Sequence, residues 1–140
     1  MDKLFLDANI LFTATYSNTG ASWAIFELAK KKKLKIVSSL YAVTEAQKNI
    51  ITKAGEGFLV TFFKLVSILS TVDKSMPSAA EVLKFSEFII AKDVPILASS
   101  FEQKVNFLIT LDQKDFRNEK IKNLKLPFVI LSPGEYLRGV

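Results

Sequence analysis

The chain has 140 residues, of which 49% are hydrophobic, and this is enough for one domain with a core that folds unaided. It carries 19 basic and 14 acidic residues, a formal net charge of +5, and neither histidine nor cysteine. These absences exclude Ser-His-Asp and Cys-His nucleophiles, paired-histidine ribonuclease chemistry, and zinc sites built on imidazole or thiolate. A hydrolase with this inventory has to use carboxylates, as an acid/base pair or as ligands of hard cations such as Mg²⁺ and Mn²⁺.

The apolar stretches are too short or too interrupted to cross a membrane. The most apolar one, residues 58–69, falls short of the ~18 uninterrupted apolar residues that a span requires, and it contains Lys64. We expect it to form a buried helix that runs on into a strand. The residues before Asp7 lack the basic and apolar regions of a secretory signal. Together with the absence of cysteine, these features favour a cytoplasmic protein without a membrane association.

The first half of the chain alternates short apolar runs, typical of buried strands, with stretches whose apolar residues recur at helical spacing. Serine and glycine residues stand where helices would begin. The expected elements are a strand over residues 3–6, helices over 8–15 and 21–33, a strand over 34–37, and a helix over 40–52.

The second half repeats this alternation. A proline two residues after Asp93 suits the first turn of a helix, where a missing amide proton is tolerated. The expected elements are a helix within residues 58–69, a polar break at 73–77, a helix over 78–91, a helix opening at 93–95, strands over 105–110 and 128–131, and a terminal helix over 132–137.

This order of elements predicts one domain spanning residues 1–140, with a three-layer α/β/α fold and a mostly parallel central sheet of about four to five strands. In such a sheet the working crevice lies outside the carboxyl ends of the strands. Asp7 and Asp112 each follow a strand closely, and they are therefore expected at this edge. Glu45 and Asp93 lie near the starts of helices that enter from the same edge.

Each of these acids taken alone is explained equally well as a helix cap, a turn residue or a solvated helix residue. Taken together, the four would repel one another strongly unless a metal ion neutralised them. The sequence therefore predicts a site for a divalent cation at the carboxyl edge of the sheet.

The four acids occur in patterns that resemble those of the PIN domain family, in order and in spacing. The resemblance covers nearly the whole chain, and residues 131–137 resemble the closing strand and helix of the family. The patterns are Leu-Phe-Leu-Asp7-Ala-Asn9, Ser38-Ser-Leu-Tyr-Ala-Val-Thr-Glu45, Lys92-Asp93-Val-Pro-Ile-Leu-Ala98 and Phe107-Leu-Ile-Thr110-Leu-Asp112.

The resemblance implies a metal-dependent endoribonuclease that leaves 5′-phosphate and 3′-hydroxyl ends on RNA. Many family members are toxins of the VapC type, so it also implies a small antitoxin protein as a partner, and it is compatible with a homodimer. One or two Mg²⁺ or Mn²⁺ ions would be bound by the matching acids, which are Asp7, Glu45, Asp93 and Asp112.

The fourth acidic position has two candidates, because Asp112 and Asp115 lie within one helical turn of each other. We favour Asp112, which is closer to the end of the strand, and consider Asp115 either a helix cap or a ligand that acts through water. The resemblance further implies that Asn9 and Thr110, each beside a matched acid, support the metal ligands or orient the substrate.

The densest basic run is formed by Lys30, Lys31, Lys32 and Lys33. It is either a solvated helix end whose charge suits the helix dipole, or a patch that contacts RNA phosphates. The net charge of +5 favours a polyanionic partner. Apolar surface on residues 58–69 is expected to be buried in the core, with a dimer contact or an inhibitory peptide as the alternative.

Three other classes of protein remain to be weighed. A catalytically inactive PIN-like scaffold that binds RNA or protein would not need all four acids. An aspartate-nucleophile phosphatase of the haloacid dehalogenase type would use Asp7, but Asn9 stands where a second aspartate is expected. A receiver domain needs an acid pair at the first strand and a lysine after the last, and neither is evident.

Overall fold

The computed structural model describes residues 1–139. Its centre is a five-stranded sheet in the order β3-β2-β1-β4-β5, in which every neighbouring pair of strands is parallel. The strands are β1 (Lys3–Leu6), β2 (Lys35–Ser39), β3 (Thr71–Asp73), β4 (Phe107–Ile109) and β5 (Val129–Leu131).

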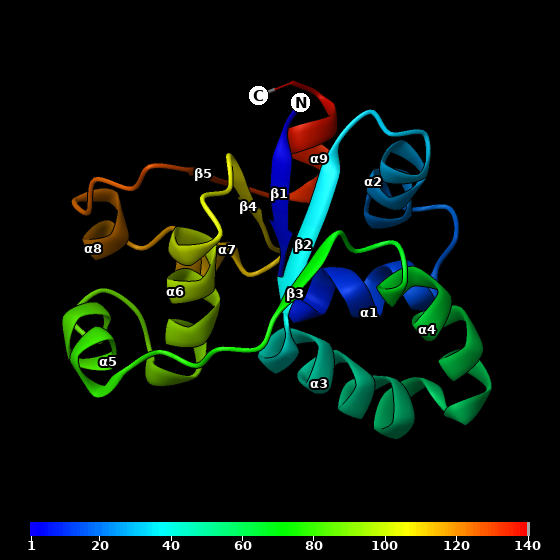
Figure 1. Ribbon diagram of the computed structural model, residues 1–140, viewed down its shortest axis with the longest axis horizontal. Coiled ribbons are helices and arrows are strands. Elements are labelled where there is room, and N and C mark those ends of the chain that lie inside the picture. Colours follow the sequence, from blue (N-terminus) through cyan, green and yellow to red (C-terminus); the bar gives the residue numbers. More distant parts are fainter. Residues whose placement is uncertain (140) are drawn as a thin grey trace.

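Helices cover both faces of the sheet, which confirms the three-layer α/β/α fold (Figure 1). One face carries α1 (Ala8–Tyr16), α2 (Ala21–Lys30) and α4 (Leu59–Val66), and α3 (Leu40–Asn49) packs against α1 and α4 near the carboxyl edge. The remaining helices are α5 (Ala79–Phe85), α6 (Val94–Glu102), α7 (Gln113–Phe116), α8 (Glu119–Lys122) and α9 (Pro133–Leu137), of which α5, α6 and α8 lie on the other face.

The sheet is built from apolar runs because its central strands are covered on both sides. Leu4, Phe5 and Leu6 of β1 are fully buried, and so are Leu108 and Ile109 of β4. A strand that is covered on both faces has no solvent side, so its sequence does not alternate.

The order of the strands reverses at β1. The chain passes from β1 to β2 and β3 on one side, and then crosses the sheet to β4 and β5 on the other. Leu6 pairs with Ile109, so β1 and β4 end side by side at this reversal. A crevice is expected at such a point, because the connections leaving the two strands run to opposite faces.

Several element boundaries differ from the sequence prediction. The expected helix over residues 21–33 stops at Lys30, because Lys32 adopts a left-handed backbone conformation with φ 59°. The expected helix over 40–52 is α-helical only to Asn49 and continues as a π-helical turn over Ile50–Ala54. The helix expected over 78–91 ends at Phe85.

The helix within residues 58–69, which was expected to be buried, is buried on one side only. Phe62 and Leu65 of α4 reach the core, but Val60 and Phe63 are 66% and 50% exposed. The strand expected to follow this helix is β3, which ends at Asp73, where the predicted polar break begins. Within the described chain, every helix is too short or insufficiently apolar to span a bilayer.

Candidate active site

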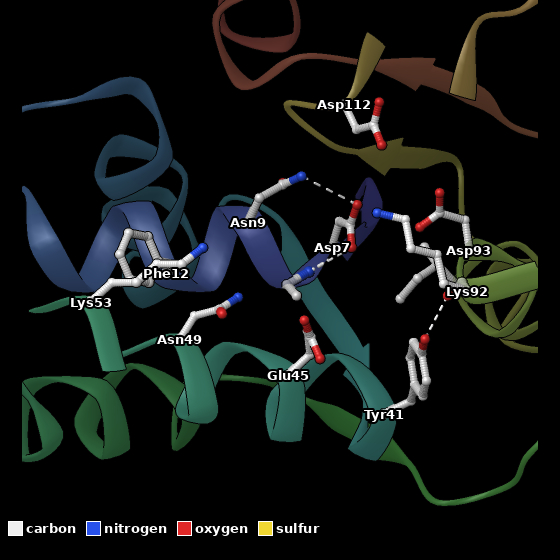
Figure 2. A pocket seen from close by; sticks show the side chains of 12 residues that line it. Asp7, Asn9, Phe12, Tyr41, Glu45, Asn49, Lys53, Lys92, Asp93 and Asp112 are labelled. Atoms are coloured by element: carbon white, nitrogen blue, oxygen red, sulfur yellow. Dashed lines mark hydrogen bonds between the residues drawn. The ribbon is translucent and has the colours of Figure 1, made fainter. Parts of the chain in front are cut away.

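A cleft of about 240 Å³ opens at the carboxyl ends of β1 and β4 (Figure 2). Its walls come from α1, α3 and the start of α6, together with the segment after β4. All four acids that the sequence patterns single out line this cleft, namely Asp7, Glu45, Asp93 and Asp112.

Asp7 is buried at the junction between β1 and α1. One of its oxygens, Oδ1, accepts a hydrogen bond from the Ala8 amide at 2.7 Å, so the residue is indeed a helix cap. The other, Oδ2, accepts from the Thr110 hydroxyl at 2.8 Å. Burial raises the pKa of Asp7, and the nearby charge of Asp112 adds to this effect, although the two hydrogen bonds oppose it.

Asn9 and Thr110 fix the position of Asp7. The Asn9 amide donates to Asp7 Oδ2 at 3.4 Å, and its carbonyl oxygen accepts from the Leu111 amide at 3.1 Å. Thr110 Oγ1 also accepts from the Asp112 amide at 3.0 Å. These bonds tie the carboxyl ends of β1 and β4 together, which is the arrangement expected of residues that orient a metal ligand.

Asp93 is buried and has an unsatisfied carboxylate oxygen. It ends a 3₁₀ turn over Ala91–Asp93 directly before α6, but its side chain makes no capping hydrogen bond. No hydrogen-bond partner for Oδ2 exists within residues 1–139. Burial raises the pKa of Asp93 to about 7, and the charges of Asp7 and Asp112 act in the same direction. A buried polar atom without a partner calls for a ligand, because leaving it unpaired is unfavourable.

Asp112 and Asp115 complete a group with Asp93. One carboxylate oxygen from each of the three residues lies within 4.8 Å of the others. Asp112 caps α7 by accepting from the Asp115 amide at 3.0 Å, so the cap is Asp112 rather than Asp115. The structure thus brings both candidates for the fourth acid to Asp93, although Asp115 is not among the residues that line the cleft itself.

Glu45 faces the other acids from the opposite wall. It lies exposed on α3, and Figure 2 shows its carboxylate directed toward Asp7. The neighbouring Tyr41 donates its hydroxyl proton to the Lys92 carbonyl oxygen at 2.6 Å. Burial and then the charge of Glu45 raise the pKa of this tyrosine.

The donors present fit a hard divalent cation. The cleft presents carboxylate oxygens and no nitrogen or sulfur ligands of the kind that zinc prefers. Asp93 belongs to the three-acid group and also carries the unpartnered Oδ2, so a cation bound at this residue would meet an unmet demand for a polar contact.

Four polar residues in the cleft were not identified as site residues from the sequence, namely Tyr41, Asn49, Lys53 and Lys92. Lys92 extends across the acids in Figure 2, and its charge lowers the pKa of both Asp7 and Asp93. The i, i+4 spacing from Tyr41 through Glu45 to Asn49 was the available signal, but it is equally typical of a solvated helix face.

The lysine run lies away from this cleft. Lys30 ends α2, and Lys31, Lys32 and Lys33 lead into the amino end of β2, whereas the acids lie at the carboxyl ends of the strands. The Lys30 ammonium pairs with Glu27 at 3.3 Å and lies 5.5 Å from the centre of the Trp23 ring. These contacts favour a solvated helix end, and RNA contact by the run stays a prediction.

Comparison with known proteins identifies the fold. No protein-family model and no curated protein sequence matches the chain. Among solved structures, it resembles a chain of the Rickettsia felis VapBC2 complex, which was crystallised with a DNA fragment from the VapBC2 promoter. The TM-score is 0.66 at 20% identity, and the match covers 93% of this chain and 98% of that chain. The protein also resembles PAE2754 from Pyrobaculum aerophilum, with a TM-score of 0.56, 15% identity, and coverage of 92% and 90%. The chain therefore has the PIN-like fold of VapC-type proteins.

Proposed function

We propose that the protein is a divalent-metal-dependent endoribonuclease that hydrolyses phosphodiester bonds of RNA. The observation that carries this proposal is Asp93, which lines the cleft of a PIN-like fold, belongs to a three-acid group and has a buried, unpartnered Oδ2. A buried oxygen without a hydrogen-bond partner is uncommon in a protein core and is typical of a ligand-binding site.

The proposed ligands are Asp7, Glu45, Asp93 and Asp112, with Asp115 as an additional ligand that acts through water. When bound there, one or two Mg²⁺ or Mn²⁺ ions would orient the scissile phosphate and lower the pKa of the attacking water.

The residues around the acids serve this chemistry through position and charge. Thr110 and Asn9 keep Asp7 in one orientation, so it does not have to reorganise when a cation arrives. Asp93 holds a proton near neutral pH in the absence of a cation, and it has to release this proton to become a ligand. The Lys92 ammonium would then be available to a phosphate oxygen of the substrate.

The proposal extends to a toxin–antitoxin pair. The Rickettsia felis neighbour is a VapBC2 structure, which supports a small antitoxin protein as the partner of this chain. Copurification of a small protein that suppresses RNA cleavage would test this part. A homodimer is also part of the proposal, and light scattering measures it directly.

The central experiment compares cleavage of single-stranded and structured RNA with Mg²⁺, with Mn²⁺ and with EDTA. Cleavage that requires the cation is expected, with a loss of at least 100-fold in Asp93→Asn, because removal of a metal-ligating carboxylate removes both binding and orientation. Glu87→Gln serves as the matched control, since Glu87 is exposed and does not line the cleft.

Three outcomes would contradict the proposal. Equal cleavage by the wild type and by Asp93→Asn would point to a contaminating nuclease. Calorimetric titration with Mn²⁺ that gives the same affinity for the wild type and for Asp7→Asn would remove the metal site. Binding of Mn²⁺ and RNA without any cleavage would favour the inactive scaffold instead.

A further inference from the structure

The cleft continues past the acids along α1 and the end of α3. Three of its lining residues lie on this side, namely Phe12, Asn49 and Lys53. Figure 2 shows the nitrogen ends of Asn49 and Lys53 directed into the cleft, with the Phe12 ring beside Lys53. We call these three residues, together with the neighbouring Tyr16, the outer subsite.

A change of helix type places Lys53 on the cleft. Tyr41, Glu45, Asn49 and Lys53 follow one another at intervals of four residues. An α-helix turns about 100° per residue, so each step of four residues drifts about 40° around the axis. From Ile50 to Ala54 the chain is π-helical, and its wider turn opposes this drift. The polar stripe therefore stays on the cleft wall instead of rotating away from it.

The side chains of Lys53 and Asn49 make neither ion pairs nor hydrogen bonds with other side chains in residues 1–139. Lys53 is exposed and makes no ion pair within residues 1–139. The half-buried Asn49 amide forms no side-chain hydrogen bond in the same part of the chain, so its donors and acceptor remain available to a ligand.

Aromatic rings continue the cleft outward. Phe12 stacks on Tyr16, one helical turn along α1, with ring centres 6.1 Å apart and an angle of 6° between the planes. Tyr16 in turn packs against Phe58 at 5.3 Å, yet it remains 58% exposed. Phe12 and Phe58 are partly buried, so Tyr16 presents most of the exposed aromatic surface. Aromatic rings beside a free ammonium group are a combination with which proteins bind single-stranded nucleic acid, since every base has a face that can stack.

We propose that the outer subsite binds the nucleotide adjacent to the scissile phosphate of a single-stranded RNA. Lys53 contacts its phosphate, Asn49 the edge of its base or its ribose hydroxyl, and Phe12 and Tyr16 the face of its base. This inference rests on the proposed function and adds the strandedness of the substrate, because a base has to be unpaired before it can stack on these rings.

RNA binding without cleavage provides the test. Fluorescence anisotropy of a labelled single-stranded RNA is measured with the full chain in EDTA, for the wild type, Lys53→Met and Lys48→Met. Lys48 is the matched control, because it lies exposed on the same helix and does not line the cleft. Lys53→Met is expected to weaken binding about three- to tenfold and to reduce the salt slope by about 0.7, as loss of one phosphate contact does. Lys48→Met should change neither quantity appreciably.

The aromatic part is tested with Tyr16→Ser and with duplex RNA of the same sequence. Tyr16→Ser changes an exposed side chain, and it is expected to weaken single-strand binding about fivefold or more. Duplex RNA should bind more weakly than the single strand, and Tyr16→Ser should leave duplex binding unaltered. Single-stranded DNA serves as the second arm, and weaker binding than RNA is expected if Asn49 reads the ribose hydroxyl.

The inference and the proposed function fail in different ways. Equal losses in Lys53→Met and Lys48→Met, or no RNA binding by the wild type, would overturn the outer subsite. Cleavage with an unchanged KM in Lys53→Met would also overturn it and leave the nuclease function standing. RNA binding that depends on Lys53 without any cleavage would support the outer subsite and refute the nuclease function.

Discussion

The carboxyl group of Asp93 keeps its proton to a higher pH than an exposed aspartate does, because of its surroundings. Burial raises its pKa from 3.8 to about 7, and the charges of Asp7, Asp112 and Asp115 add to the shift. Lys92 opposes it only in part. The fold therefore stores unfavourable electrostatic energy in the cleft whenever this group ionises in the absence of a cation.

This leads to a prediction for the stability of the metal-free protein. The free energy of unfolding should fall as pH rises from about 4 to 7, because the unfolded chain releases the Asp93 proton while the folded chain retains it. Below about pH 4 Asp93 is protonated in both the folded and the unfolded chain, so it adds no pH dependence to stability. Above about pH 7 the loss of stability from ionising the buried carboxyl group is complete. Between pH 5 and pH 8, the free energy of unfolding of Asp93→Asn should rise by about 3 kcal/mol relative to that of the wild type, as measured by urea unfolding in EDTA.

With Mn²⁺ present at pH 8, the wild type should become more stable than Asp93→Asn. A bound cation favours the ionised carboxylates, so the wild type should be stabilised and Asp93→Asn much less so. In EDTA, the difference in stability between the wild type and Asp93→Asn should change from pH 5 to pH 8. An unchanged difference would contradict the proposed environment of Asp93.

The Lys92 side chain is predicted to compete with a cation for the acids of the cleft. Its ammonium group lowers the pKa of Asp7 and Asp93, so it acts on the acids as a positive charge that competes with a cation. Lys92→Met should therefore tighten Mn²⁺ binding about threefold at pH 8.5, which lies above the Asp93 pKa of about 7, and should weaken RNA binding. Calorimetry measures the first effect and anisotropy the second. If Lys92→Met weakens both interactions, the side chain supports the cleft structurally instead.

Among the elements, α3 and its π-helical extension form the wall on which substrate selection is proposed to depend. The extension stops at Gly55, whose backbone has φ 104° and ψ 156°. This region of conformational space is accessible to glycine and to almost no other residue. The end of the wall is therefore fixed by backbone conformation rather than by side-chain packing.

Gly55→Ala should lower the free energy of unfolding by about 1–3 kcal/mol because of this conformation. Gly57→Ala is the control, since Gly57 does not have a positive φ and its added methyl group would meet no atom within 4 Å. It should leave stability nearly unchanged or raise it slightly. Thermal or urea unfolding of the two variants makes the comparison, and equal effects would mean that Gly55 does not fix the turn.

At the scale of the molecule, sequence patterns were sufficient for the centre of the sheet and insufficient for its margins. The buried strands β1 and β4 can be recognised in the sequence as apolar runs, because both of their faces are covered. Strand β3 lies at the edge, has three residues and is partly exposed, so no apolar run marks it. The single-turn helices α7 and α8 are too short to show a periodicity.

The acids were predictable because the topology of a parallel sheet fixes where the residues after its strands must lie. Asp7 and Asp112 could be assigned to one edge on that basis, and both line the cleft. Asp112 was preferred over Asp115 for its place near the end of the strand, and this preference stays a prediction, because a single sequence does not show how one turn of α7 is capped. Lys53 and Lys92 were missed because nothing in a single sequence distinguishes a lysine that reaches into a cleft from one in solvent.

The hydrogen bond between Asp7 and Thr110 joins residues that are 103 positions apart in the chain, and it lies across the pairing of β1 with β4. Contacts of such large sequence separation form late and slowly during folding, because a long loop has to close first. During synthesis, Asp7 emerges long before the segment that carries Asp112 and Asp115 exists. A growing chain therefore has no complete acidic cleft until the segment that carries Asp112 and Asp115 has been made and has joined the sheet.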